Sequence, residues 1–265
     1  MFSGAEEHVV YRILNAPMRG YPYPHIYVDS VFPPDFYAAL RGNWPSAEHL
    51  VSLAATNRVT GGAYAERFIM PLRKAEIEKL PKTSREFWTE FSGWLLSGRF
   101  LDAMVEKFEE YVRMRYGGDA SNVGFGCESL VVRDHTNYNL GPHTDSPSRL
   151  LSLLFYCPDD ESMKHLGTSI YTPIDPDFRC PGGPHHPHDL FKKVATMEYR
   201  PNTLFAFMKT DNSFHGVEPI DDSGVLRDLL LYDIRVKEDA AQMRSMGAAP
   251  GLGFRMLRNI FGGKR

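Results

Sequence analysis

Residues 138–145 of the chain read Tyr-Asn-Leu-Gly-Pro-His-Thr-Asp, and this stretch carries an imidazole and a carboxylate two residues apart. Side chains two residues apart in a β-strand point to the same face of the sheet. We therefore expect His143 and Asp145 to be presented together, with Thr144 turned away. A His-x-Asp pair is common by chance, and such a pair alone is more often just two surface residues. The rest of the chain has to supply a third ligand.

A second histidine stands in a suitable context farther along the chain. His215 follows a strand-like run at residues 203–207, which the turn signal Pro201-Asn202 introduces. Two histidines and one carboxylate form the facial triad that holds Fe(II) in non-haem oxygenases and leaves coordination positions open. The order His143, Asp145, His215 predicts such a site. Taken alone, His215 reads as a hydrogen-bonded core histidine.

An arginine opens the strand that we expect at residues 226–236. Arg227 has the same parity as Leu229 and Leu231, so it points inward with them if the interior is apolar. A buried guanidinium is costly unless it is paired. No acid at a fixed spacing is an obvious partner, because Asp228 faces the other way. The planar fork of the side chain suits a carboxylate, and we expect a carboxylate-bearing ligand there.

Together these residues resemble the Fe(II)- and 2-oxoglutarate-dependent dioxygenases, and within them the prolyl-hydroxylase-like branch. The resemblance implies that His143, Asp145 and His215 bind Fe(II). It implies that Arg227 anchors the far carboxylate of the co-substrate 2-oxoglutarate, with help from Tyr138. The likeness extends over roughly residues 20–236.

The resemblance also implies a reaction, in which O2 oxidises a substrate while 2-oxoglutarate is converted to succinate and CO2. Hydroxylation is favoured because Asp145 fills a position where halogenating relatives carry a small residue. We expect a small molecule or a glycan-linked intermediate as the substrate. A prolyl or other protein side-chain hydroxylase is the alternative. A non-oxidative cupin-like isomerase or sensor is the alternative of another class, although such sites use more histidines and leave Arg227 without a purpose.

Composition excludes some classes of function. The 265 residues include 43% hydrophobic ones, which suits one globular domain, and the net charge of −3 gives no sign of a nucleic-acid partner. No apolar run reaches transmembrane length, and the N-terminus does not read as a secretory signal. Three scattered cysteines fit a reducing compartment, so we expect a cytoplasmic protein.

The expected architecture is mainly β, with N-terminal helices. Aromatic residues recur at helical spacing over residues 84–116, with a break at Ser97-Gly98, which indicates helices packed outside a sheet. Short strand-like runs follow residue 124. The resemblance implies that they form a double-stranded β-helix, the cupin-like jelly-roll. We therefore expect a single domain over residues 1–265. Its parts are a helical part at about 1–117, a jelly-roll core at about 118–240 and a basic tail at about 241–265.

Two further segments leave alternatives open. The loop at residues 173–190 contains Cys180, His185, His186 and His188, which could bind a second metal. Their spacing matches no standard zinc pattern, so a solvated loop or a lid near the iron is favoured. The basic C-terminal tail has the pattern of a short amphipathic helix that could contact a membrane surface. Docking onto the protein's own body, or fraying, is the favoured reading of the tail.

Overall fold

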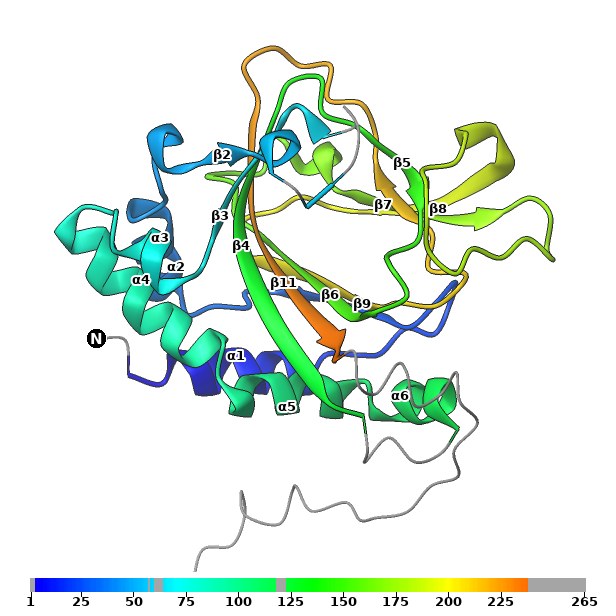
Figure 1. The fold of residues 1–265 in the computed structure, drawn as a ribbon, viewed down its shortest axis with the longest axis horizontal. Coiled ribbons are helices and arrows are strands. Elements are labelled where there is room, and N and C mark those ends of the chain that lie inside the picture. The colour runs from blue at the N-terminus through cyan, green and yellow to red at the C-terminus, as the bar shows by residue number, and fades with distance from the viewer. Residues whose placement is uncertain (1–2, 57, 60–63, 118–122, 238–265) are drawn as a thin grey trace, which may run out of the picture.

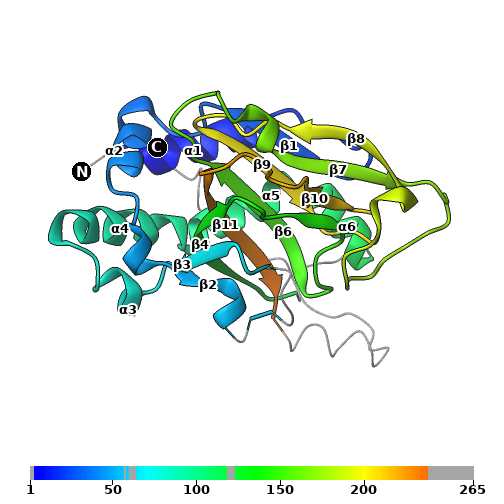
Figure 2. The same ribbon diagram turned by 90° about the horizontal axis from the view of Figure 1, so that it is seen from above.

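Two antiparallel sheets face each other beside a group of helices in the computed structural model, which describes residues 3–56, 58–59, 64–117 and 123–237 (Figure 1). The larger sheet has the strand order β1 (His25–Asp29), β9 (Thr203–Met208), β6 (Arg149–Tyr156), β11 (Leu226–Val236), β4 (Phe125–His135), β3 (Arg67–Pro71) and β2 (Val51–Ser52). The smaller sheet has the order β5 (Leu140–His143), β10 (His215–Val217), β7 (Thr168–Pro173) and β8 (Phe191–Met197). Strands β7 and β8 lie far from α2 and α4 (Figure 2).

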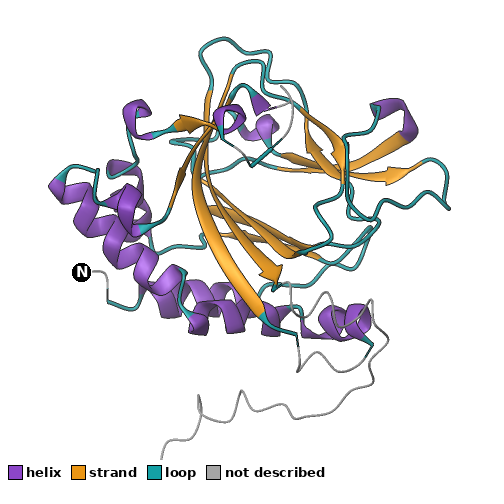
Figure 3. Ribbon diagram, in the orientation of Figure 1, coloured by secondary structure: helices purple, strands orange, loops and turns teal. Residues whose placement is uncertain are grey.

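The α-helices lie in the N-terminal part of the chain, as the aromatic spacing predicts. Figure 3 shows them in purple beside the strands. They are α1 (Ala5–Leu14), α2 (Pro34–Gly42), α3 (Lys74–Ile77), α4 (Lys82–Leu95), α5 (Gly98–Lys107) and α6 (Glu109–Tyr116). The expected break is the junction of α4 and α5, where the side chain of Ser97 caps α5 by accepting from the Phe100 N–H at 3.1 Å. No helix among the described residues is both long and apolar enough to cross a membrane.

Alternation along the central strands divides the core into two layers. On β11, Leu230, Tyr232 and Ile234 pack with the helices, whereas Leu229 packs in the space between the two sheets. Successive side chains of a strand point to opposite faces, so a strand covered on both faces needs apolar residues throughout. This is why the middle of β11, residues 229–232, is apolar on both faces.

Most of the expected elements are present. The bounds of β11 match the expected strand, and β9 extends the run expected at residues 203–207 by one residue. The short strands β2 and β3 were not expected from the sequence, because residues 45–72 show no clear period. The mainly antiparallel fold with N-terminal helices is therefore confirmed, while the basic tail at about 241–265 lies outside the described residues.

Candidate metal and ligand site

The two histidines of the candidate site are cross-strand neighbours. His143 ends β5 and His215 begins β10, and the two residues are paired in the antiparallel ladder. The close approach of these strands depends on Gly216, since a Cβ at that position would lie 2.3 Å from the carbonyl oxygen of Leu140. A glycine next to His215 is thus a packing requirement.

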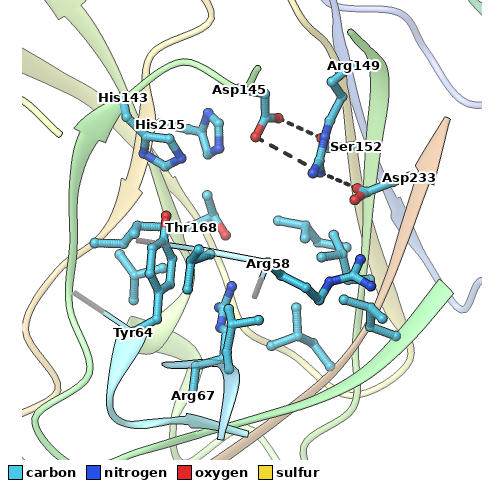
Figure 4. Close-up of a pocket in the computed structure, with 18 of the residues that line it drawn as sticks. Arg58, Tyr64, Arg67, His143, Asp145, Arg149, Ser152, Thr168, His215 and Asp233 are labelled. Carbon is cyan, nitrogen blue, oxygen red and sulfur yellow. Dashed lines mark hydrogen bonds and ion pairs between the residues drawn. The ribbon is translucent and has the colours of Figure 1, made fainter. Parts of the chain in front are cut away.

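Asp145 completes the group, but not by the route expected from strand geometry. Strand β5 ends at His143, so the carboxylate is carried by the loop that follows and not by the same strand face. Thr144 does turn away, and its hydroxyl donates to the carbonyl oxygen of Cys180 at 2.8 Å. One ligand atom from each of His143, Asp145 and His215 lies within 4.8 Å of the others, so the three could hold one metal ion (Figure 4).

Backbone carbonyls fix the orientation of both imidazoles. Nδ1 of His143 lies 3.0 Å from the carbonyl oxygen of Gly141, and Nδ1 of His215 lies 3.0 Å from that of Ser213. Because a carbonyl only accepts, each Nδ1 carries the proton and each Nε2 keeps a free lone pair. Burial, together with His215 and His185, lowers the pKa of His143 to about 3, and burial also lowers the pKa of His215. Both rings are therefore neutral, which is the form that binds metals.

The surroundings of Asp145 keep its carboxylate ionised. Burial by itself would raise the pKa of Asp145, but the charge of Arg149, helped by the hydrogen bond from Ser152, outweighs it and keeps the pKa well below its usual range. The Ser152 hydroxyl donates to Oδ2 of Asp145 at 2.7 Å, and Arg149 Nη1 lies 3.9 Å from Oδ1. Such hydrogen-bonded support orients ligands in metal sites.

A cavity of about 180 Å³ opens beside these three residues, between the two sheets (Figure 4). The adjacent strands β11 and β4 form the floor of the cavity. They pair in the register Arg227↔Asp134 and Asp233↔Glu128. Between these two charged pairs the inward residues of both strands are apolar. They are Leu229, Leu231, Leu130 and Val132. The cavity floor therefore has two charged ends and an apolar middle.

Arg227 lies at the inner end of the cavity and points inward, as its parity predicts. It is 1% exposed and lines the cavity. The expectation that it lacks an acidic partner is wrong, since Nη1 donates to Asp134 Oδ2 at 2.7 Å, and Nε donates to the carbonyl oxygen of Leu166 at 2.7 Å. Its Nη2 is buried and has no hydrogen-bond partner among the described residues.

Asp134 also binds a second guanidinium that sequence reasoning missed. Arg67, on the unexpected strand β3, donates to both carboxylate oxygens of Asp134, at 2.6 and 2.9 Å, and lines the cavity. Two guanidinium groups thus share one carboxylate at this end of the cavity. Within the described part of the chain, one positive charge is left without a counter-charge there, next to the Nη2 of Arg227 that has no partner.

Tyr138 is close to this end of the cavity. It is 1% exposed, and its ring lies under the Arg67 guanidinium at 4.5 Å from ring centre to Cζ. Burial raises the pKa of its phenol, which therefore stays protonated. The hydroxyl oxygen has no partner within the described part of the chain. Tyr138 does not itself line the cavity but packs against Arg67, which does.

The histidine-rich loop does not gather into a second metal cluster within the described residues. His185 lies beside the triad, with its ring centre 4.9 Å from that of His143 and its Nε2 3.2 Å from the Tyr64 hydroxyl. His186 lies 3.5 Å from the sulfur of Cys180, and His188 packs on Tyr171. The loop therefore borders the triad, and its side chains have separate partners.

Comparison with known proteins supports the fold. No protein-family model matches the sequence, and no curated protein matches it. Among solved structures, a prolyl 4-hydroxylase from Phytophthora capsici is similar over 97% of this chain and 72% of its own, at 14% identity and a TM-score of 0.51. A prolyl 4-hydroxylase from Pseudomonas putida is similar over 88% of this chain and 99% of its own, at 12% identity and a TM-score of 0.45. The resemblance seen in the sequence is therefore confirmed at the level of the fold.

A third similar structure is an oxidoreductase of the 2OG-Fe(II) oxygenase family from Burkholderia pseudomallei. It covers 88% of this chain and 91% of its own, at 10% identity and a TM-score of 0.43. At such identities the likeness concerns the fold, and what the chain does has to be argued from its own residues.

Proposed function

We propose that the protein is an Fe(II)- and 2-oxoglutarate-dependent oxygenase with a jelly-roll core, which hydroxylates a small molecule or a glycan-linked intermediate and releases succinate and CO2. The observation that carries the proposal is the convergence of two neutral imidazoles and one carboxylate beside a cavity whose inner end has an unused guanidinium nitrogen. In this proposal His143, Asp145 and His215 hold the metal, and Arg227 holds the co-substrate.

The residues present fit Fe(II). Two imidazole nitrogens and one carboxylate are the donor set of non-haem iron oxygenases, and three ligands leave positions for other molecules. Bound there, the iron would supply the redox chemistry with O2. The chain's own part is to keep His143 and His215 in the tautomer with a free Nε2, and to keep Asp145 ionised through Ser152 and Arg149.

The residues present also fit 2-oxoglutarate. Its distal carboxylate would accept from Nη2 of Arg227, and it would neutralise the charge that Asp134 leaves uncompensated on Arg227 and Arg67. The free hydroxyl of Tyr138 stands behind this pair and is proposed to assist. Burial of the anchor keeps water from competing for the carboxylate.

A prolyl or other protein side-chain hydroxylase is the second candidate, favoured by the prolyl 4-hydroxylases among the similar structures. A non-oxidative metal-binding isomerase or sensor would use the same triad but has no use for a dicarboxylate. A requirement for 2-oxoglutarate therefore distinguishes the oxygenase from this non-oxidative alternative.

The three cysteines form no disulfide. They suit a reducing compartment, such as the cytoplasm, where iron stays Fe(II).

An anaerobic titration tests the proposal directly. Fe(II) and 2-oxoglutarate added together should give a weak visible charge-transfer band that saturates at one equivalent of iron. The band should be absent with iron alone, and absent in His215→Ala with both added. A wild-type protein that binds iron but gives no band with 2-oxoglutarate would favour the non-oxidative alternative. Failure to bind iron at all would reject the triad.

A further inference from the structure

The outer end of the cavity carries a second group of charges, which we call the mouth cluster: Arg58, Arg149, Arg235, Glu128 and Asp233. Arg58 Nη2 lies 2.7 Å from Glu128 Oε1, and Arg235 lies 3.5 Å from both Glu128 and Asp233. Arg149 forms a short ion pair with Asp233. Three guanidinium groups thus share two carboxylates.

The mouth cluster is separate from the inner end where Arg227 lies. Arg227 and Asp233 are six residues apart on β11, and at about 3.4 Å per residue their backbones are about 20 Å apart. Exposure increases outward, from 2% for the side chain of Asp233 to 29% for Arg58 and 36% for Arg235. The cluster therefore occupies the open end, where a second molecule would enter after the co-substrate has filled the inner end.

Ordinary surface ion pairs do not account for the cluster. Asp145 lies 3.9 Å from Arg149, but in the function proposed above it also binds the metal ion, so its charge would not by itself balance that of Arg149. Burial raises the pKa of Asp233 to about 6, although Arg149 opposes the shift. Both contacts of Arg235 to acids are at 3.5 Å, too long for strong charge-assisted hydrogen bonds. Counted over the described residues, a positive charge remains at the mouth.

We propose that the substrate oxidised by this protein carries an anionic group, a carboxylate or a phosphate, that binds Arg58 and Arg235 at the mouth of the cavity. The proposal rests on the function proposed above and adds the chemical class of the substrate. The rest of the substrate lies on apolar residues between the mouth and the metal, among them Leu154 and Leu231, which line the cavity. The carbon to be oxidised would then lie beside His143, Asp145 and His215, the residues that would hold the iron.

Small probe molecules with an apolar body test this proposal without knowledge of the natural substrate. Benzoate, phenyl phosphate and the neutral benzamide are titrated by calorimetry into protein saturated with Mn(II) and 2-oxoglutarate, at constant ionic strength. We expect at least one anion to bind tenfold or more tightly than benzamide. The preferred anion, benzoate or phenyl phosphate, identifies the group as carboxylate or phosphate.

Charge-neutral variants locate the binding. Arg235→Gln and Arg58→Gln should each weaken binding of the anionic probe at least fivefold and leave benzamide unchanged. The matched control is Arg99→Gln, because Arg99 is 53% exposed and pairs only with Glu6 and Glu7 among the described residues. Equal binding of anionic and neutral probes, no binding of any probe, or equal losses in all three variants would each overturn the proposal.

The same titrations are repeated without Mn(II) and 2-oxoglutarate, and Mn(II) affinity is measured separately in every variant. Anion binding that depends on Arg235 in a protein that fails to bind Mn(II) would uphold the anion site and reject the oxygenase. If Mn(II) and 2-oxoglutarate bind normally but Arg235→Gln does not change anion binding, the oxygenase would be upheld and the anion site rejected. The two proposals can thus fail independently.

Discussion

Replacing Asp134 by Asn tests whether a single carboxylate holds two guanidinium groups at the inner end of the cavity. Asp134 is fully buried and accepts three hydrogen bonds, at 2.6 and 2.9 Å from Arg67 and at 2.7 Å from Arg227. The amide of Asn keeps the shape but removes the charge, so both guanidinium groups lose their counter-ion. Little solvent is present to screen them, because the side chains of Arg67 and Arg227 are 12% and 1% exposed.

The expected magnitude follows from this burial. Breaking a buried ion pair by removing one partner costs about 3–5 kcal/mol. In a protein of about this size each 1 kcal/mol lowers Tm by about 2–4 °C, so the variant should melt about 6–20 °C below the wild type. If the distal carboxylate of 2-oxoglutarate binds the same guanidinium groups, it should replace part of the lost charge. We expect 2-oxoglutarate with Mn(II) to recover about 1.5–3 kcal/mol more in the variant than in the wild type, roughly one charge-assisted hydrogen bond.

The outer face of the sheet supplies a matched control. Asp228 also bridges two arginines, accepting from Arg133 at 2.7 and 2.9 Å and from Arg41 at 3.1 Å. Asp228→Asn should destabilise the protein to a similar extent, without any added response to 2-oxoglutarate. Melting curves with and without Mn(II) and 2-oxoglutarate measure both variants. A Tm loss below about 2 °C in Asp134→Asn, or equal responses of the two variants to 2-oxoglutarate, would refute the reasoning.

Other variants address the metal, the anchor and the packing of the site. Replacing His143, Asp145 or His215 by Ala should abolish the Tm increase caused by Mn(II) while the far-ultraviolet circular dichroism spectrum stays unchanged; a retained equivalent of metal in the triple variant would show that the site is elsewhere. Arg227→Ala should raise the 2-oxoglutarate concentration for half-maximal succinate release at least tenfold with metal binding intact, and Arg227→Lys should be milder but impaired because Lys lacks the fork; unchanged half-saturation would exclude Arg227 as the anchor. Gly216→Ala should lower Tm and weaken Mn(II) binding, because the added methyl group forces β5 and β10 apart; wild-type values for both would contradict the packing argument.

Local patterns in the sequence were enough to predict most elements and the metal triad. The alternation in residues 226–236 gave the inward direction of Arg227, because the period of a strand follows from backbone geometry alone. The order of His143, Asp145 and His215 indicated a metal site, and the three residues do converge. The expected strand geometry at Asp145 was wrong because a short strand can end between two residues of a motif.

Cross-strand partners could not be predicted in the same way. Asp134 lies opposite Arg227 only because β4 and β11 pair in one particular register. Arg67 joins them because β3 pairs with the other side of β4. Register depends on the packing of the whole sheet, and no local signal in the sequence specifies which acid will meet which arginine. An arginine at an inward position of an expected strand is the signal that could have suggested Arg67. The strand that carries it, β3, was itself not expected.

The pairing of His143 with His215 has a consequence for how firmly the small sheet is closed. Strand β10 is three residues long, and its ladder with β5 contains only the pairs His215↔His143 and Val217↔Leu140, with an irregularity between them. So short a ladder opens at little free-energy cost, and its amide protons should exchange with solvent sooner than those of β4 and β11, which share eleven paired positions. A metal ion that binds both imidazoles would fasten one end of this ladder, because opening would then require the loss of a ligand. Amide exchange in β5 and β10 should therefore slow on metal binding far more than exchange in the large sheet. The ion would thus stabilise the pairing of two strands as well as take part in the reaction.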